Sequence, residues 1–244
     1  MALLEVRGVG KTFGGLQAVK DLSFTLEAGE ILGIIGPNGA GKTTAFNMIA
    51  GFFPPDTGSI RFKGEDITGW RPWDISHRKI ARTFQLSKPF GDLSVMENVM
   101  VGGFHHQGGR VAARRKSEEM LDFVGMGSLA AVEANNLTAT DRKRLELARC
   151  LATEPELLLL DEVVAGATPT EAGAMMELIR KVRAGGVTII MVEHVMRVIM
   201  GLSDRVLVLH HGETIAVGAP QAVSKDPTVL KAYLGERHVQ PAAS

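Results

Sequence analysis

The stretch EILGIIGPNGAGKTT, residues 30–44, decides the fold. Its first half is a continuous apolar run, which is typical of a strand that is buried on both faces. Its second half, GPNGAGKTT at 36–44, fits the pattern Gly-x-x-x-x-Gly-Lys-Thr, directly after that strand and before a helical pattern. A glycine-rich turn between a strand and a helix predicts a phosphate-binding loop.

Each part of this loop has its own task in binding phosphate. The glycines let backbone amides turn inward around phosphate oxygens, and the helix start adds its dipole. Lys42 adds a positive charge at the β and γ phosphates, and the Thr43 hydroxyl can ligate Mg²⁺. The predicted nucleotide-binding residues are Gly36, Pro37, Asn38, Gly39, Ala40, Gly41, Lys42, Thr43 and Thr44.

The rest of the chain predicts an α/β fold with a mostly parallel core sheet, because apolar runs alternate with helical patterns. Buried strands are expected at 30–36, 156–162 and 186–193, and helices at about 42–50, 170–184 and 195–202. The more alternating N-terminal segments predict an antiparallel sheet at the edge. A hairpin is expected at 205–218, turned at His211 and Gly212, and the region from about 88 to 150 predicts a helical insert.

Composition excludes several classes of protein. The chain has 244 residues and a formal net charge of zero, which does not indicate attraction to nucleic acid. Its one cysteine, Cys150, cannot form an internal disulfide and is expected to be buried in a helix. The N-terminus lacks the pattern of a signal peptide, and no apolar run is long enough to span a bilayer, so a cytoplasmic location is expected.

Two acids end the second buried strand, ELLLLDE at 156–162. The carboxyl edge of a parallel sheet is where ligands bind, so these acids are expected beside the phosphate loop. Asp161 is the candidate for holding Mg²⁺, usually through water, and Glu162 for orienting or deprotonating the attacking water. Without the phosphate loop, two solvated acids at a strand end would be the simpler interpretation.

Three further residues are weaker candidates when each is taken alone. His194 follows the third buried strand and could reach a γ-phosphate, although a structural histidine is the simpler interpretation. Gln85 could sense both Mg²⁺ and water, or be polar surface. Phe13 could stack on a base, or belong to the core.

This set of motifs resembles the ATP-binding cassette (ABC) ATPases over almost the whole chain. GPNGAGKTT matches the Walker A motif, and LLLLDE matches Walker B with the catalytic glutamate. Gln85 falls at the Q-loop, His194 at the switch histidine, and Phe13 at the aromatic residue that stacks on adenine. The resemblance implies ATP and Mg²⁺ as cofactors. It implies catalytic roles for Lys42, Gln85, Glu162 and His194, and metal ligation by Thr43, Gln85 and Asp161.

The stretches ARTFQLSKPFGDLSVMENV and DPTVLKAYLG are similar to the ATP-binding subunits of branched-chain amino-acid importers. Such subunits work in pairs under two transmembrane permease subunits, with a periplasmic solute-binding protein, at the cytoplasmic face of the inner membrane. The resemblance also implies three parts within one ABC domain. They are a RecA-like core with its β-subdomain (1–87 and 151–218), a helical subdomain (88–150) and a C-terminal helical tail (219–244).

The signature motif of the family, Leu-Ser-Gly-Gly-Gln, is altered here. Its positions hold Leu137, Thr138, Ala139, Thr140 and Asp141. Thr140 replaces the glycine that approaches the partner's γ-phosphate, and a β-branched residue is a poor substitute there. Asp141 is expected to cap a helix that begins at Arg142, and its charge would repel the partner's ATP.

Other departures lie nearby: Val163 after the catalytic glutamate, Thr168 in the D-loop, and Val195 after the switch histidine. Most of these positions face the partner in the family. The sequence therefore predicts a heterodimer in which this chain contributes its Walker motifs to one competent site and an altered signature to the other.

Three alternatives remain open from the sequence. An exporter subunit for lipid or lipopolysaccharide has very similar motifs. A non-transport ABC protein usually has two cassettes, or a coiled coil within one, so a single phosphate loop in 244 residues argues against it. A weakly hydrolysing regulatory subunit is kept open by the altered signature, and the intact Glu162 weighs against it.

Overall fold

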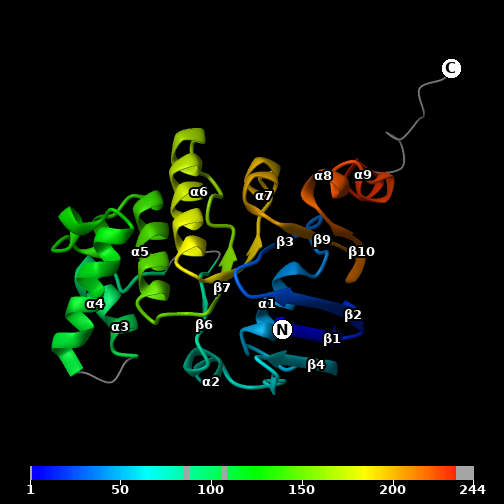
Figure 1. Cartoon of the computed structure of the whole chain (residues 1–244), viewed down its shortest axis with the longest axis horizontal. Helices are drawn as coiled ribbons and strands as arrows, with labels where there is room; N and C mark the ends of the chain where they lie inside the picture. The colour runs from blue at the N-terminus through cyan, green and yellow to red at the C-terminus, as the bar shows by residue number, and fades with distance from the viewer. Residues whose placement is uncertain (1, 85–87, 106–108, 235–244) are drawn as a thin grey trace. The chain divides into compact units, whose positions relative to one another are not determined.

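The computed structural model describes residues 2–84, 88–105 and 109–234 (Figure 1). Contacts divide the chain into two compact units. Unit 1 comprises residues 1–72 and 188–244, and unit 2 comprises residues 73–187. Besides the predicted helical region, the described part of unit 2 contains two strands and two further helices. These two units therefore differ from the three predicted parts, which stay a prediction.

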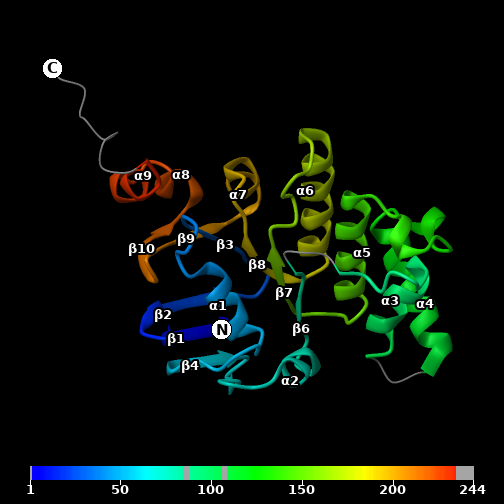
Figure 2. The same ribbon diagram turned by 180° about the vertical axis from the view of Figure 1, so that it is seen from behind.

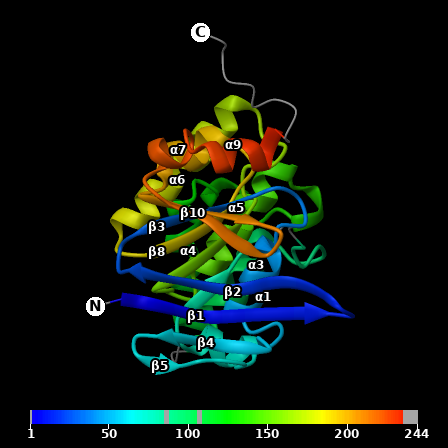
Figure 3. The ribbon, with the colours of Figure 1, turned by 90° about the vertical axis from the view of Figure 1, so that its right-hand side faces the viewer.

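Unit 1 contains an antiparallel sheet built from the N-terminal segments. Its strands are β1 (Ala2–Phe13), β2 (Leu16–Glu27), β4 (Thr57–Phe62) and β5 (Glu65–Asp66), in the order β2-β1-β4-β5. Figure 3 shows β2, β1 and β4 side by side. Leu4 and Val6 are buried while Arg7 is exposed, which is the partial alternation expected of a sheet with one covered face. The predicted antiparallel sheet is confirmed.

Unit 1 also contains the parallel strands β3 (Ile31–Ile35), β8 (Thr188–Val192) and β9 (Arg205–His210). β3 lies between β8 and β9 and is parallel to both (Figure 2). Every residue of β3 and β8 is buried, as their unbroken apolar sequences predict. β10 (Glu213–Gly218) returns antiparallel to β9. His211 and Gly212 have φ of 49° and 81°, the left-handed pair that a tight hairpin turn requires, so the predicted hairpin is confirmed.

The helices of unit 1 follow its strands. They are α1 (Lys42–Ile49), α7 (Met196–Leu202), α8 (Pro220–Val223) and α9 (Pro227–Leu234). Phe46 and Ile49 of α1 are fully buried, as are Val198 and Ile199 of α7. The two predicted helices at 42–50 and 195–202 are therefore confirmed, within one residue at each end.

Unit 2 pairs two short strands in parallel, β6 (Ile80–Arg82) and β7 (Leu157–Asp161). α2 (Pro72–His77) begins at the boundary between the units. The other helices are α3 (Val95–Gly103), α4 (Gly109–Phe123), α5 (Ala139–Leu151) and α6 (Pro169–Ala184), with 3₁₀ turns at Gly127–Leu129 and Ala134–Asn136. α3, α4 and α5 pack on one another (Figure 1). β6 was not predicted, because three residues are too few for a periodic signal.

None of the helices within the described residues combines the length and the apolar character needed to cross a membrane. The side of α5 that carries Leu145, Leu147 and Ala148 is apolar, and these three residues are almost fully buried.

Cys150 of α5 is buried as predicted, and burial raises the pKa of its thiol to about 12. The thiol donates a hydrogen bond to the carbonyl of Arg82 at 3.2 Å. We expect no alkylation of the native protein by iodoacetamide at pH 8, because the thiolate is the reactive form. Mass spectrometry should show modification only after denaturation. Rapid labelling of the native chain would contradict this burial.

Candidate nucleotide-binding site

The phosphate loop turns sharply away from β3, and two of its positions admit only glycine. Gly36 has φ of 152°, and a Cβ added there would lie 2.1 Å from the carbonyl oxygen of Leu209. Gly41 has φ of 102°, and its Cβ would lie 2.5 Å from the carbonyl oxygen of Ala18. These contacts explain why the pattern fixes glycine at both ends of the turn.

Lys42 lies over this turn rather than extending into solvent. Its side-chain nitrogen donates to the carbonyls of Gly36 and Pro37, at 2.7 and 2.9 Å, and only 7% of the residue is exposed. Gly41 is the N-cap of α1 and provides no side-chain cap for the amides of the first turn. A buried ammonium beside uncapped helix amides fits an anionic phosphate group.

His194 is a second candidate at the carboxyl edge of the parallel strands of unit 1. Ile34 of β3 pairs with Val192 of β8, so the phosphate loop and His194 follow neighbouring strands at the same edge. His194 is exposed. Phe13 is 44% exposed at the end of β1, with its ring 5.2 Å from that of Phe53 in an edge-on contact. Phe13 is therefore not a core residue. Gln85 lies outside the described residues.

Unit 2 holds the two acids that end β7. The Asp161 carboxylate is 2% exposed and forms an ion pair with Arg82, at 2.9 Å between Oδ2 and Nη2. Its amide donates to the Thr83 hydroxyl at 3.0 Å. The carboxylate offers the oxygen ligands that Mg²⁺ prefers, and in this structure its charge is paired with that of Arg82.

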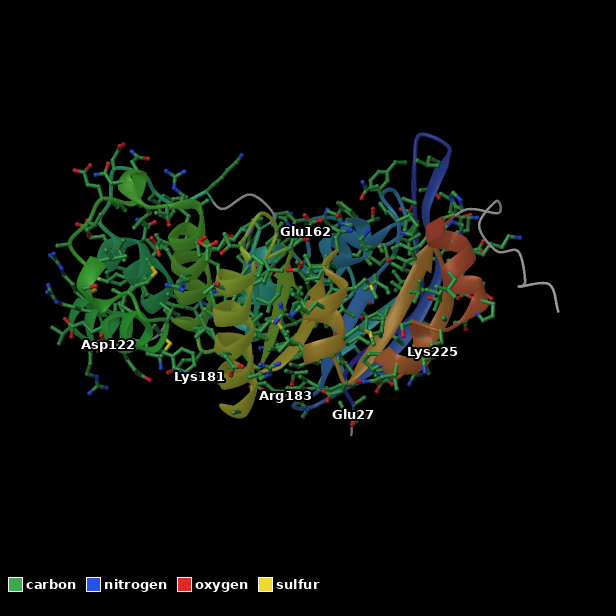
Figure 4. All side chains as sticks on the ribbon, turned by 90° about the horizontal axis from the view of Figure 1, so that it is seen from above. Glu27, Asp122, Glu162, Lys181, Arg183 and Lys225 are labelled. Carbon is green, nitrogen blue, oxygen red and sulfur yellow. The ribbon has the colours of Figure 1, made fainter. Side chains whose placement is uncertain are left out.

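Glu162 follows in a left-handed conformation, with φ of 51°. Such a conformation costs a non-glycine residue about 1–2 kcal/mol. The Lys143 side chain of α5 donates to the carbonyls of Glu162 and Ala165, which fixes this turn. Figure 4 shows Glu162 near the N-terminal end of α6, while Lys181 and Arg183 lie at its other end. The strain is retained at the residue for which a catalytic role is predicted.

The start of α5 corrects one prediction. The helix begins at Ala139, not at Arg142, and its N-cap is Thr138 rather than Asp141. The Thr138 hydroxyl accepts from the Asp141 amide at 3.1 Å and donates to the Asp141 carboxylate at 2.7 Å. Asp141 lies in the first helical turn, where its charge stabilises the helix dipole. The prediction failed because two possible caps stand three residues apart, and the first of them is used.

Thr140 is bonded to another helix of unit 2. Its hydroxyl donates to Glu171 of α6 at 2.7 Å. The same Glu171 carboxylate accepts from the amide and the hydroxyl of Thr168, each at 2.8 Å, in the capping box of α6. Sequence reasoning missed Glu171, although Thr-x-x-Glu at 168–171 is the pattern of a capping box. Glu171 therefore connects two positions that depart from the ABC pattern, Thr140 and Thr168.

Comparison with known proteins places this geometry in a family. Residues 19–165 match the ABC transporter family, and residues 213–239 match branched-chain amino acid ATP-binding cassette transporters. The high-affinity branched-chain amino acid transport ATP-binding protein LivG of Salmonella typhimurium is 39% identical, over 96% of this chain and 98% of its own. BraF of Pseudomonas aeruginosa, described in the same words, is 37% identical over the same share of this chain.

A solved structure agrees with these sequence matches. The ADP conformation of MJ1267, an ATP-binding cassette of an ABC transporter, has a TM-score of 0.88 and 30% identity, covering 97% of this chain and 100% of that one. The chain therefore belongs to the ABC transporter family. It is an ABC-type ATPase, similar to the ATP-binding proteins of branched-chain amino-acid transport.

Glu171 allows a test of the connection between α5 and α6. The hydrogen bonds from Thr140 and then from Thr168 lower the pKa of Glu171 from its usual 4.5 to about 2. A lowered pKa in the folded state means that the ionised side chain stabilises the fold above pH 4.5, and that this stabilisation is lost as the pH falls toward 2. We expect Glu171→Gln to lower the urea midpoint at pH 7, and the difference from wild type to narrow below pH 4.5.

Glu177→Gln, on the exposed part of the same helix, is the matched control, since Glu177 forms a surface ion pair with Arg180, three residues along the same helix. It should leave the midpoint almost unchanged at pH 7, because surface pairs contribute little. A Glu171→Gln midpoint equal to that of the control would show that Glu171 does not stabilise the connection.

Proposed function

We propose that this chain is the ATP-binding and hydrolysing subunit of an importer for branched-chain or related amino acids. The observation that carries the proposal is the phosphate loop, with Lys42 buried over a turn that admits only glycine at both ends. The substrate class is supported by the relatives' names and by the match of residues 213–239. The partners proposed are a second ATPase subunit, two permease subunits and, indirectly, a solute-binding protein, with this chain at the cytoplasmic face of the membrane.

The chain's own residues have separate roles in this proposal. The amides of 36–44 and Lys42 hold the phosphates, and Phe13 stacks on the base. Thr43, Gln85 and Asp161 hold Mg²⁺, which when bound neutralises charge that develops on the phosphates. Glu162 orients or deprotonates the attacking water, and His194 contacts the γ-phosphate from the edge where β3 and β8 end. The exposed Phe13 ring and the position of the Asp161 carboxylate at the end of β7 support these roles.

We propose that the pair of ATPase subunits is asymmetric. Thr140 replaces the glycine expected to approach the partner's γ-phosphate, and its hydroxyl is engaged by Glu171. The carboxylates of Asp141 and Glu171 stand at this helix start, where an incoming phosphate would be repelled. This chain's Walker motifs would then serve one competent site with the partner's signature, while its own signature faces an idle one.

A second candidate is an exporter subunit. The lipopolysaccharide export system ATP-binding protein LptB of Acidithiobacillus ferridurans is 32% identical over 96% of this chain. The match of residues 213–239 to branched-chain amino acid cassettes favours the importer. Leucine uptake by the reconstituted complex would distinguish the two, because an exporter subunit would not drive it.

The asymmetry makes a prediction about hydrolysis by the complete complex in liposomes. Lys42→Ala should lower ATP-dependent uptake and hydrolysis by about 100-fold or more, because a charge that stabilises the transition state is removed. The equivalent lysine change in the partner subunit should be tolerated. Equal damage from both changes would show that Thr138–Asp141 is a working variant of the signature.

A restored signature provides the matched control. The combined change Thr138→Ser, Ala139→Gly, Thr140→Gly and Asp141→Gln should create a second competent site. Lys42→Ala should then leave measurable hydrolysis, which it does not in the natural background. A complex that gains no activity from the restoration would place the asymmetry elsewhere than in this motif.

A further inference from the structure

Arg82 forms an ion pair with Asp161, the proposed metal ligand, and lies three residues before Gln85 in the sequence. It is the last residue of β6, and its guanidinium pairs with the Asp161 carboxylate at 2.9 Å. Both side chains are buried, at 9% and 2% exposure. Buried ion pairs are less screened by water than surface pairs, so the charge of Arg82 acts strongly on Asp161.

The main chain around Arg82 is fixed independently of this ion pair. The amide of Thr83 donates to the carbonyl of Leu159 at 2.9 Å, and the Cys150 thiol donates to the carbonyl of Arg82. The amide of Phe84 donates to the buried carboxylate of Glu146 at 2.6 Å. These main-chain bonds do not involve the guanidinium, so a weakening of the ion pair leaves them intact.

Arg82 and a metal ion make opposite demands on the same carboxylate. Asp161 attracts Mg²⁺ through its negative charge, and the guanidinium neutralises that charge and repels a nearby cation. We propose that Arg82 is a resident counter-ion of Asp161 that opposes Mg²⁺ binding, so that Mg²⁺ and nucleotide bind only by weakening this ion pair. The inference rests on the proposed role of Asp161 in holding Mg²⁺.

Before nucleotide binds, Arg82 stabilises the buried site. It balances a carboxylate that would otherwise be buried with its charge uncompensated, which is costly. It also raises the Mg²⁺ concentration that nucleotide binding requires. The ion pair thus stabilises the folded site while no Mg²⁺ or nucleotide is bound, and it makes nucleotide binding depend on a higher Mg²⁺ concentration.

The test is a Mg²⁺ titration of nucleotide binding by the full chain, followed with a fluorescent ATP analogue at pH 8. Arg82→Gln should lower the Mg²⁺ concentration for half-maximal binding by about fivefold or more, which is the size of an ordinary coupling between sites. Arg82→Lys keeps the charge and should stay within about twofold of wild type. A midpoint that is unchanged or raised in Arg82→Gln would overturn the inference.

Two further variants keep the result interpretable. Arg82→Met preserves volume and should shift the midpoint in the same direction as Arg82→Gln. Arg205→Gln removes a partly exposed ion pair, to Glu30 at 2.9 Å in unit 1, and should lower the unfolding temperature without moving the Mg²⁺ midpoint. An equal shift in the Arg205 variant would show that the Arg82 effect is one of stability only.

Asp161→Asn separates this inference from the function on which it rests. Loss of the Mg²⁺ response in Asp161→Asn, with no shift in Arg82→Gln, overturns only the role of Arg82. A Mg²⁺ response that survives in Asp161→Asn overturns the role proposed for Asp161, and the inference with it.

Discussion

A buried carboxylate at the end of β7 is the constraint on which unit 2 depends. Taking the charge of Asp161 out of water costs several kcal/mol unless a cation and hydrogen bonds compensate. Arg82 supplies the cation and Thr83 receives the Asp161 amide. Arg82 ends the three-residue strand β6 and Thr83 follows it, and so short a strand has no periodic pattern in the sequence. β6 also pairs in parallel with β7, so the partner of Asp161 is held on the neighbouring strand.

A buried charge has a comparable effect in unit 1. The ammonium of Lys42 is held by two main-chain carbonyls of the turn that it covers. That turn exists only because Gly36 and Gly41 adopt conformations that exclude a Cβ. Each unit thus fixes a charged group: Asp161 at the end of β7, and Lys42 at the start of the helix that follows β3. The surrounding apolar strands supply rigidity, and the charged group supplies the chemistry proposed for the site.

Much of the fold follows from the sequence, because burial on both faces gives β3, β7 and β8 unbroken apolar runs. The hairpin turn at His211 and Gly212 could also be predicted from the sequence. The first residue of α5 could not be predicted, because the choice between two possible caps depends on local geometry. The hydrogen bond from Thr140 to Glu171 could not be predicted either, because the two residues are 31 positions apart. Pairing at that distance leaves no periodic trace in either segment.

The phosphate loop and the acids could be named as site residues from their patterns alone. The contacts that surround these residues could not be predicted from the patterns. The ion pair of Arg82 with Asp161 joins residues 79 positions apart. The left-handed Glu162 lies in a turn that is fixed by the Lys143 side chain of α5. These contacts decide how much charge each group presents, which a motif does not specify.

We propose that this chain binds the ATP of the single competent site and contributes an altered signature to the other site. The decisive measurement is a structure of the complete complex with ATP and Mg²⁺, carrying Glu162→Gln to stop hydrolysis. We expect ATP to be enclosed between residues 36–44 of this chain and the partner's signature. We also expect Thr140 to stay bonded to Glu171 and to make no phosphate contact at the other site. Two equally closed sites, with Thr140 against the partner's γ-phosphate, would contradict this proposal.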